Sequence, residues 1–588
     1  METVISRFFA NADHFGSTPI FRFNTGGQWV PMGWRTAAGL ASDFASGLMS
    51  MGHEKGDSLS IISQTRWEWA ICDLGTLAAG GITVGVYPTM TADQSRYIVA
   101  HSDSRFVVVE DKKQLAKIES VRSQLPRIEK IIIIDPAGVS LGGEKMSLSE
   151  VLSKGRAAKH DPMERVAKLR LEDAATFVYT SGTTGPPKGA MLTHGNLMAE
   201  LHSVDRVLQV KEDDTGFIFL PLAHVLQKIV SYHGFWKGIP GSFARSLDTV
   251  AEDMAACRPS IVAAVPRIFE KVYARVHDQA AAGPALRKKI FDWAVKTGLG
   301  VSHLRQAHES VPRRMEIEHA LGSKLVFQKL RDRLGGRVRL FITGGAPIAK
   351  DILSFFDAAG ITILEGWGMT ETCGAASLNL PGASRFGSIG KPLPDVDMRL
   401  DDDGEILIRG PMVFSGYYKD EEATKGSFTA DGYFRTGDIA RKDADGYYFI
   451  IDRKKDLIIT AAGKNVAPQN IENMVKTDPR ISQVVVIGDR RPYLTALVAV
   501  TPELRSSRSE ADLVAMVQEI VNNKNQEMAS YERIKKIRLL PGELTQEAGE
   551  LTPTLKVKRK IVNDRYGSLI EEMYSEPKAA QGVATGAG

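Results

Sequence analysis

The stretch of sequence best suited to chemistry is a segment rich in glycine and hydroxyl groups. It reads Thr-Ser-Gly-Thr-Thr-Gly-Pro-Pro-Lys-Gly from Thr180 to Gly189. Glycines let backbone N–H groups close on an anion without interference from side chains. The hydroxyls add donors and the lysine adds a positive charge, so the segment predicts a triphosphate-binding loop. Its candidate ligands are Thr180, Ser181, Gly182, Thr183, Thr184 and Lys188.

The same segment departs from the commonest phosphate loop. A Walker A loop has glycine immediately before its lysine and Ser or Thr immediately after it, whereas Pro187 and Gly189 flank Lys188. A flexible polar turn is the alternative, because Gly, Ser and Thr are common in loops. The segment alone therefore leaves nucleotide binding open.

Four further motifs follow the loop along the chain. They are Trp367-Gly368-Met369-Thr370-Glu371, Thr436-Gly437-Asp438, the charged run Asp452 to Asp456, and Leu551 to Arg559, which contains Lys556. With these motifs in this order, the sequence resembles the acyl-adenylate-forming superfamily, which includes acyl-CoA ligases, luciferases and carrier-protein adenylation domains. Trp367 stands where this family has tyrosine. The motifs span most of the chain.

The resemblance implies a two-step reaction. A carboxylate attacks the α-phosphorus of ATP and releases pyrophosphate, and a thiol such as that of coenzyme A then attacks the acyl adenylate. Both partners in the first step are anions, and a cation about 4 Å from either attracts it by roughly 4 kcal/mol at an intermediate dielectric. The resemblance assigns this catalytic task to Lys556. The alternative is one more solvated lysine in a basic run.

The resemblance also implies ligands for a metal ion and for adenine. Glu371 and Thr184 are the expected catalytic Mg²⁺ ligands, since a hard cation takes carboxylate and phosphate oxygens. Thr370 is expected at the α-phosphate and Trp367 near the adenine. Gly345, Ala346 and Pro347 resemble the family's adenine contact, although they also read as a simple strand-to-helix turn. Gly366 and Gly368 are further expected cofactor-binding residues.

Three further residues match positions around the ribose and the acid. Asp438 and Arg453 resemble the residues that hold the ribose hydroxyls, a task that suits an acidic acceptor; surface turn charges are the alternative. His224 matches a position near the carboxylate-binding site. A direct catalytic role and a purely structural role both remain open for this histidine.

The charged run Asp452 to Asp456 resembles the family's hinge. In the family the C-terminal domain rotates between the two steps, and Lys455 matches the residue that absorbs the dihedral change. Gly463 is expected on a loop that faces the thiol tunnel. A glycine-containing turn without that function is the alternative.

Several stretches look most similar to the long-chain fatty-acid–CoA ligase branch. They are 220–226, 265–273, 366–372 and 460–471. One departure concerns the acyl tunnel, because Lys228 occupies a position where some long-chain ligases have a gating Trp. A gate of that kind is therefore in doubt.

Three hypotheses about function follow. The favoured one is a ligase that joins a fatty acid to coenzyme A with ATP and Mg²⁺. The second is a ligase that passes the acyl group to a carrier protein. The third is a catalytically silent sensor of nucleotides or acyl ligands, against which the retention of Lys556, Glu371 and Asp438 argues.

The elements that must position these residues follow an α/β pattern. Alternating strands and helices run from Trp34 to Ile134 and again from Thr176 to the predicted strand Ile361–Leu364, which indicates two doubly wound α/β subdomains. Short strands and Asp-Gly turns in 387–451 predict a small β-rich subdomain. We expect an N-terminal ATP- and acyl-binding domain over 1–451, a hinge at 452–456, a mobile α+β lid at 457–575 and a disordered tail at 576–588.

Composition narrows the class of protein. A chain of 588 residues needs two or more domains, and 74 basic against 70 acidic residues gives a net charge of +4, unlike a nucleic-acid binder. Three distant cysteines form neither a metal motif nor a disulfide framework, which favours a reducing compartment.

The sequence predicts neither a secretory signal nor a membrane span. The most apolar stretch, 69–87, contains Asp73 and is interrupted by Gly80-Gly81. We therefore expect a cytoplasmic protein whose partners are a fatty acid, ATP and coenzyme A. Peripheral contact at the inner membrane face stays open, because basic residues near the C-terminal motif can meet anionic lipid or simply be solvated.

Overall fold

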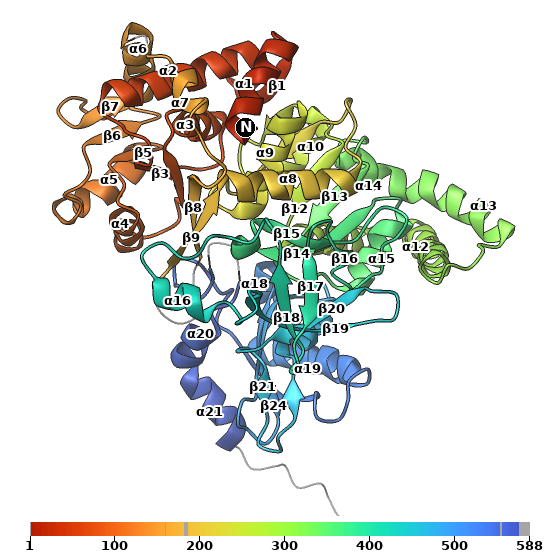
Figure 1. Cartoon of the computed structure of the whole chain (residues 1–588). Coiled ribbons are helices and arrows are strands. Elements are labelled where there is room, and N and C mark those ends of the chain that lie inside the picture. Colours follow the sequence, from red (N-terminus) through yellow and green to blue (C-terminus); the bar gives the residue numbers. More distant parts are fainter. Residues whose placement is uncertain (1, 159, 181–185, 553–555, 576–588) are drawn as a thin grey trace, which may run out of the picture. The chain divides into compact units, whose positions relative to one another are not determined.

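The chain folds into two compact units, Met1–Ile450 and Ile451–Gly588. The structure is a computed structural model that describes residues 2–158, 160–180, 186–552 and 556–575. Figure 1 colours the elements along the sequence. The first unit contains two large sheets, and the second contains a smaller sheet with its own helices.

The first large sheet has seven strands in the order β7-β6-β5-β3-β4-β8-β9. All neighbours pair in parallel except β8 and β9, which form an antiparallel hairpin. The strands are β3 (Ser58–Ile62), β4 (Ile82–Val86), β5 (Phe106–Val109), β6 (Lys130–Ile133), β7 (Lys145–Ser147), β8 (Ala174–Thr180) and β9 (Lys188–Thr193). The connecting helices are α2 (Trp34–Ser50), α3 (Trp67–Ala78), α4 (Ala92–His101), α5 (Lys112–Ser120), α6 (Leu148–Ala158) and α7 (Pro162–Val166).

The second large sheet has nine strands in the order β16-β15-β14-β13-β12-β10-β11-β1-β2. Its strands are β1 (Pro19–Thr25), β2 (Gln28–Gly33), β10 (Gly216–Ile218), β11 (Gly241–Phe243), β12 (Ile261–Ala264), β13 (Leu340–Thr343), β14 (Ile363–Met369), β15 (Gly374–Leu378) and β16 (Lys391–Pro392). Its helices include α1 (Val4–Phe15), α8 (His194–Leu208), α9 (Val225–Lys237), α10 (Val250–Cys257) and α15 (Lys350–Ala358). The alternation of strands and helices confirms the predicted α/β class.

Two features of this sheet differ from the prediction. Strand β14 begins two residues later than the predicted strand Ile361–Leu364 and runs on to Met369. It is longer because its second half pairs antiparallel with β15, a contact that the local pattern does not reveal. The pattern also left 266–333 unassigned, where the chain forms α11 (Pro266–Ala281), α12 (Ala285–Gln306), α13 (Arg313–Gly322) and α14 (Gln328–Arg333).

A four-stranded antiparallel sheet forms the predicted β-rich region. Its strands are β17 (Asp397–Leu400), β18 (Glu405–Arg409), β19 (Phe434–Lys442) and β20 (Tyr448–Arg453). Gly404, Gly432 and Gly446 turn the chain at φ of 84°, 84° and 88°, a left-handed conformation that glycine adopts without a Cβ clash. A short helix, α16 (Glu421–Gly426), lies between β18 and β19.

The second unit has a three-stranded sheet in the order β23-β24-β25 and a two-stranded hairpin. The sheet strands are β23 (Ile481–Ile487), β24 (Leu494–Val500) and β25 (Ile534–Leu539), and the hairpin joins β21 (Ile458–Ile459) to β22 (Asn465–Val466). The helices are α17 (Pro468–Val475), α18 (Pro502–Ser507), α19 (Glu510–Asn525), α20 (Arg559–Arg565) and α21 (Gly567–Ser575).

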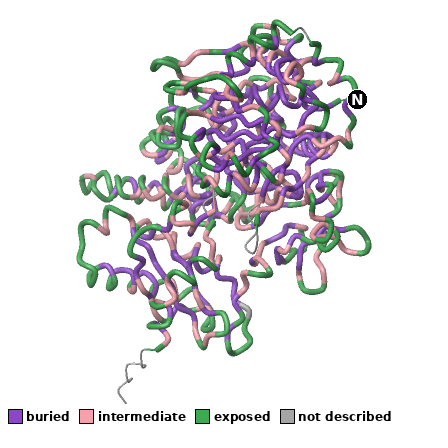
Figure 2. The backbone as a smooth tube through the Cα atoms, turned by 90° about the vertical axis from the view of Figure 1, so that its left-hand side faces the viewer, coloured by how far each residue is buried: buried purple, intermediate pink, exposed green. Residues whose placement is uncertain are grey.

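Each unit has its own apolar core. In the first unit, buried chain is concentrated inside the stacked elements, as Figure 2 shows, and Trp34, Trp69 and Tyr232 are at most 1% exposed. Valine, leucine and isoleucine from β23, β24 and α19 fill the core of the second unit. In the described part of the chain, no helix combines the length and apolar character needed to cross a membrane.

Candidate active site

The predicted phosphate loop lies at the end of the β8–β9 hairpin. Thr180 closes β8 and pairs with Lys188, the first residue of β9. Gly189 packs closely here, since a Cβ on it would lie 3.1 Å from the ring of Tyr179. The other predicted phosphate ligands, Ser181, Gly182, Thr183 and Thr184, lie outside the described residues.

Lys188 contacts a segment that is distant in sequence. Its Nζ lies 3.3 Å from Oδ2 of Asp420 and 5.1 Å from the ring centroid of Tyr417. The side chain is 40% exposed, so it keeps access to solvent and to an incoming anion. The ion pair and the aromatic face hold the lysine at the base of the predicted loop.

Tyr417 joins the loop to the next predicted motif. Its hydroxyl donates a hydrogen bond of 2.8 Å to Oε1 of Glu371. Burial and the neighbouring Glu371 carboxylate raise the pKa of Tyr417, so the hydroxyl stays protonated as a donor. The structure therefore brings Lys188 and Glu371 to the same aromatic side chain, the lysine over its ring and the carboxylate at its hydroxyl.

Sequence analysis missed Tyr417, because it belongs to none of the recognised motifs. The only local signal is an aromatic pair in a loop before α16. Its position depends on backbone pairing with β9, in which Tyr418 N–H donates to the Gly189 carbonyl at 2.8 Å and Met191 N–H to the Gly416 carbonyl at 3.0 Å.

Glu371 is fixed by its backbone as well as by its side chain. Thr370–Thr372 form a 3-10 turn after β14, and the Glu371 carbonyl accepts from Phe414 N–H at 2.8 Å. The residue is 7% exposed. A carboxylate has about four acceptor sites, so the bond from Tyr417 leaves capacity for a hard cation, and the donor type fits Mg²⁺.

The predicted adenine segments lie against each other at the ends of two parallel strands. Thr343 at the end of β13 is the register partner of Glu365 in β14. A Cβ on Gly344 would lie 3.1 Å from the Gly366 carbonyl, and Gly345 has a φ of 82°. The structure thus places Gly345, Ala346 and Pro347 beside the Gly366–Thr370 motif. This is the carboxyl edge of the sheet, where open α/β folds bind ligands.

Gly368 permits the close pairing of β14 with β15. A Cβ at this position would lie 1.7 Å from the Gly374 carbonyl, so any side chain would force the strands apart. The pairing turns the chain back immediately after Glu371 and fixes its position. A backbone requirement therefore explains why glycine follows Trp367.

A buried carboxyl supports the adenine segments from beneath. Glu365 is 6% exposed, and its Oε1 accepts a hydrogen bond of 3.4 Å from Ile348 N–H, just after Pro347. Burial raises its pKa to about 8, so the group is mostly neutral at pH 7. Sequence analysis did not single out Glu365, which precedes the motif by one residue.

Trp367 contacts the predicted ribose-binding residue directly. Its indole Nε1 donates a hydrogen bond of 2.8 Å to Oδ2 of Asp438. Asp438 N–H donates to the hydroxyl of Thr436 at 3.1 Å, and that hydroxyl donates to the Ile406 carbonyl at 2.8 Å. The Thr436-Gly437-Asp438 turn is thereby tied to β18 and aims its carboxylate at the predicted adenine site.

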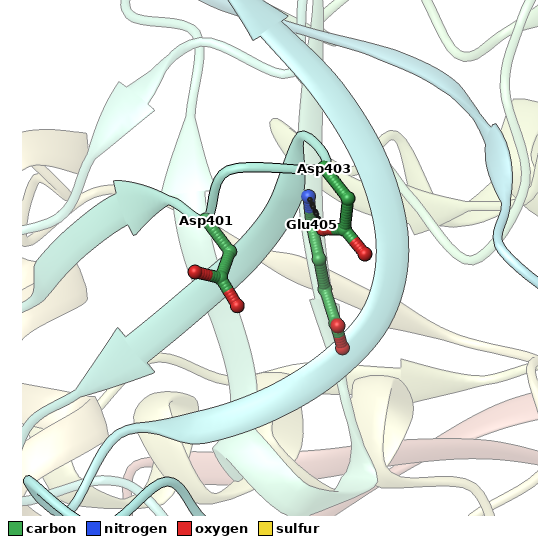
Figure 3. A group of neighbouring side chains, drawn as sticks. All are labelled: Asp401, Asp403 and Glu405. Carbon is green, nitrogen blue, oxygen red and sulfur yellow. Dashed lines mark hydrogen bonds between the residues drawn. The ribbon is translucent and has the colours of Figure 1, made fainter.

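Three acidic residues of the β17–β18 turn, Asp401, Asp403 and Glu405, cluster within 4.8 Å (Figure 3). Their contacts are structural. Glu405 Oε1 accepts from Gly437 N–H at 2.9 Å, and Asp403 Oδ1 accepts from Glu405 N–H at 3.0 Å. Arg435 lies 3.2 Å from Asp401 and 3.6 Å from Glu405. The cluster therefore supports the turn before Asp438.

His224 caps the helix α9. Its Nδ1 accepts a hydrogen bond of 3.2 Å from Leu226 N–H, which satisfies one of the orphan donors at the helix N-terminus. This is a structural role, and α9 also packs against β15, which follows the Glu371 motif. The direct catalytic role predicted for His224 stays a prediction.

Lys228, one turn further along α9, is buried in an ion pair. Its Nζ lies 2.9 Å from Oδ1 of Asp73 on α3, and both side chains are 3% exposed. Tyr232 donates to the other oxygen of Asp73 at 2.8 Å. The ammonium also lies 4.8 Å from the ring of Trp69. Burial lowers the pKa of Lys228, and its interactions hold α9 against α3.

The remaining predicted residues belong to the second unit. Arg453 ends β20, and Lys455 lies in an exposed turn closed by hydrogen bonds of 2.9 and 3.0 Å from Asp456 and Leu457 N–H to the Arg453 carbonyl. Gly463 has a φ of 73° in the loop of the β21–β22 hairpin. Their predicted roles in ribose binding, hinge motion and thiol access stay predictions.

Lys556 and Arg559 belong to the same basic run but have different environments. Lys556 is exposed, and its N–H donates to the Thr552 hydroxyl at 3.0 Å. Arg559 instead lies 2.8 Å from Glu472, and that carboxylate raises its pKa against the effect of burial. The arginine therefore anchors α20 against α17, whereas the lysine is exposed on its unit.

Family models match both units. The model described as AMP-binding enzyme covers residues 8–418, and the model described as AMP-binding enzyme C-terminal domain covers residues 455–578. The chain is 36% identical over 576 residues to the long-chain-fatty-acid–CoA ligase FadD15 of Mycobacterium bovis, covering 94% of this chain and 93% of the relative. It is 32% identical to long-chain-fatty-acid–CoA ligase 6 of Homo sapiens, covering 93% and 83% respectively.

A solved structure has the same fold. The adenylation domain of a carboxylate reductase from Mycobacterium chelonae matches with a TM-score of 0.81 and 23% identity, covering 98% of this chain and 91% of that one. The resemblance and the fold class drawn from the sequence are confirmed. The chain therefore belongs to the family of AMP-binding enzymes.

Proposed function

We propose that this protein uses ATP to convert a long-chain fatty acid into its acyl adenylate and then into acyl-CoA. The observation that carries the proposal is the chain of contacts from Lys188 through Tyr417 to Glu371. This arrangement combines a cation and a carboxylate at the end of a hairpin whose loop is rich in donors. The curated relatives named above are long-chain-fatty-acid–CoA ligases.

The contacts in the first unit suit a bound nucleotide. Segments 345–347 and 366–368 would hold the adenine, and Asp438, oriented by Trp367, would accept from the ribose hydroxyls. Lys188 would neutralise phosphate charge, with Thr180 and the loop that follows it. The Thr370 hydroxyl would lie at the α-phosphate.

Glu371 would hold Mg²⁺, with Thr184 as the second predicted ligand. When bound, the metal ion neutralises phosphate charge and polarises the phosphoryl oxygens. The Tyr417 hydroxyl orients the carboxylate by donating to one of its oxygens at 2.8 Å.

The second unit would complete each half-reaction in turn. Lys556 is exposed on its unit, and we propose that it bridges the attacking carboxylate and the α-phosphate during adenylation. The turn at Lys455 would then act as the hinge of a rotation. That rotation would replace Lys556 at the nucleotide with the loop of Gly463, which would face the thiol. Arg453, two residues before Lys455, would bind the ribose together with Asp438.

Transfer to a carrier protein is the competing reaction. The likeness to an adenylation domain of a carboxylate reductase concerns the fold alone, so it does not favour this acceptor. The relatives with 36% and 32% identity carry the name CoA ligase, which supports coenzyme A as the acceptor.

We also propose that the enzyme works in the cytoplasm, with peripheral contact to a membrane.

The direct test is AMP release with straight-chain acids of increasing length, with and without free coenzyme A. The proposal predicts release that needs both the acid and coenzyme A and that is fastest for long chains. Release that coenzyme A does not accelerate would favour the carrier-protein acceptor. The absence of acid-dependent pyrophosphate exchange would indicate a silent binding protein.

A further inference from the structure

Exposed apolar side chains gather on one helical region of the first unit. Of the twelve large apolar side chains that are exposed among the described residues, five lie between 286 and 325, so the exposure is concentrated. They are Leu286, Ile290, Ile317, Leu321 and Leu325, with exposed fractions of 71%, 37%, 58%, 53% and 58%. We call them, with the basic residues described below, the α12–α13 surface.

The apolar residues are arranged along helices. Ile317, Leu321 and Leu325 are spaced by four residues, so they share one side of α13 and of the π-helical turn Ser323–Phe327 that follows it. The side of α13 that faces α12 is different: Gly322 is buried, and a Cβ on it would lie 3.0 Å from Cβ of Ala294. The exposed stripe is therefore separate from the contact that holds the two helices together.

The two helices run antiparallel, which brings the apolar groups of α12 toward those of α13. Gly300 of α12 lies near Met315 of α13, and Ala294 lies near Gly322. Continuing in the same direction, the first turns of α12, with Leu286 and Ile290, run alongside the chain near Leu325. Figure 1 shows α13 at the outer edge of its unit, where the seven-stranded sheet does not cover it.

The same region carries a strong positive charge. Residues 285–333 contain eleven Lys and Arg against five Asp and Glu, a net charge of +6 in a chain whose total is +4. Two of the basic residues pair within their own helix, Lys288 with Asp292 and Arg314 with Glu318. No ion pair is found in the described chain for Arg287, Lys289, Arg313, Lys324 or Lys329, so their charge is available to an anionic partner.

We propose that the α12–α13 surface binds the face of a membrane that contains anionic lipid. Apolar side chains flanked by Lys and Arg on an amphipathic helix insert at the headgroup boundary, while the cations meet anionic headgroups. Charge complementarity favours this partner over a second copy, because two positively charged surfaces would repel each other. This proposal rests on the proposed function. A long-chain fatty acid partitions into membranes, so a ligase that binds a membrane would lie close to its substrate.

The test measures binding to vesicles without ATP, acid or coenzyme A. The protein is sedimented with vesicles of phosphatidylcholine alone and with vesicles that contain phosphatidylglycerol. We expect binding to the anionic vesicles only, weakened by high salt. Ile317→Glu/Leu321→Glu and Arg313→Glu/Lys324→Glu should each lower the partition coefficient at least about tenfold.

Matched controls separate this effect from general surface changes. Leu247 is 63% exposed and Lys425 is 81% exposed, and both lie outside the α12–α13 surface. Leu247→Glu and Lys425→Glu should bind anionic vesicles like the unaltered protein. Thermal unfolding checks that each variant is folded, which their exposed positions favour.

Several results would overturn the proposal. Equal binding to neutral and anionic vesicles, or unchanged binding by both double variants, would remove the role of this surface. Sedimentation velocity in the absence of lipid tests whether the surface instead joins two copies of the chain. A dimer that Ile317→Glu/Leu321→Glu converts to a monomer would show such an interface and overturn the proposal. Because vesicle binding needs no catalysis, a failed ligase assay with intact binding would contradict the proposed function alone.

Discussion

At the scale of single residues, the hydrogen bond between Trp367 and Asp438 couples the predicted adenine and ribose sites. The family has tyrosine at this position, whereas the indole here donates to Oδ2 of Asp438 at 2.8 Å. A rigid donor of this kind holds the carboxylate in one orientation. Hydrogen bonds to charged groups contribute about 1.5–3 kcal/mol.

Trp367→Phe should therefore weaken recognition of the ribose. We expect the KM for ATP to rise about tenfold, which corresponds to about 1.4 kcal/mol, while the KM for 2′-deoxy-ATP changes less. The matched control is Trp236→Phe, which removes an exposed indole hydrogen bond to Glu2. Equal changes for the two nucleotides would show that Trp367 only fills space.

Tyr417→Phe should lower kcat about tenfold and raise the Mg²⁺ concentration needed for half-maximal activity. The variant keeps the ring against Lys188 but removes the donor to Glu371, so the carboxylate loses its orientation. Tyr418→Phe removes a comparable bond to Asp103 and is the control. An unchanged Mg²⁺ dependence in Tyr417→Phe would contradict the proposed metal site.

At the scale of elements, the site depends on the end of β14 and on the turns that surround it. Strand β14 pairs with β13 on one side and with β15 on the other, and Glu365 connects it to the segment after Pro347. The pKa of Glu365 is raised to about 8 by burial, and the buried Glu200 on α8 has a similar value of about 8. The folded state therefore favours the neutral form of both carboxyls over the ionised form.

The pH dependence of stability follows from these two groups. A carboxyl whose folded-state pKa is raised contributes its full stability below the unfolded pKa near 4.5 and loses it as pH rises through about 8. The Tm should therefore fall as pH rises from about 4.5 to about 8 and level off above that. Glu365→Gln keeps an acceptor for Ile348 N–H and should reduce this fall.

The double variant Glu200→Gln/Glu365→Gln should flatten the same profile further. Glu316→Gln, at an exposed position on α13, is the control and should leave the profile unchanged. Thermal unfolding across this pH range provides the measurement. A slope in Glu365→Gln as steep as in the unaltered protein would show that Glu365 is ionised in the folded state.

The elements predicted from the sequence are those whose pattern is local. Short β-rich runs such as Phe106–Val109 and the motif turns at Gly345 and Gly437 follow from residue type. Tyr417 and Glu365 could not be found in this way, because their roles depend on pairing between segments far apart in the chain. The longer β14 was missed because its second half depends on pairing with β15. The stretch 265–273 was noted only for its resemblance to the long-chain branch, and the helices of 266–333 were left unassigned.

At the scale of the whole molecule, the residues proposed for the chemistry are divided between two units. The first unit, Met1–Ile450, contains Glu371, Asp438 and Lys188, and the second, Ile451–Gly588, contains Lys455 and Lys556. Adenylation and thiol transfer would use different faces of the second unit. Lys455 lies in the turn that joins β20 to β21.

Lys455→Pro should separate the two half-reactions. Proline fixes φ near −65° and removes a backbone donor, so it should hinder rotation at this turn. We expect acid-dependent pyrophosphate exchange to persist while coenzyme A-dependent AMP release falls about a hundredfold. Lys454→Pro, at the adjacent turn position, tests how local the effect is. An equal loss of both half-reactions would count against the hinge.

The central claim is that Lys556 from the second unit catalyses adenylation on a nucleotide held by the first. Its most direct test is acid-dependent pyrophosphate exchange in Lys556→Ala, with ATP affinity measured in parallel and Lys560→Ala, from the same basic run, as the control. The account predicts that exchange falls by about a hundredfold or more in Lys556→Ala while ATP still binds, and that Lys560→Ala exchanges normally. Normal exchange in Lys556→Ala would contradict the claim.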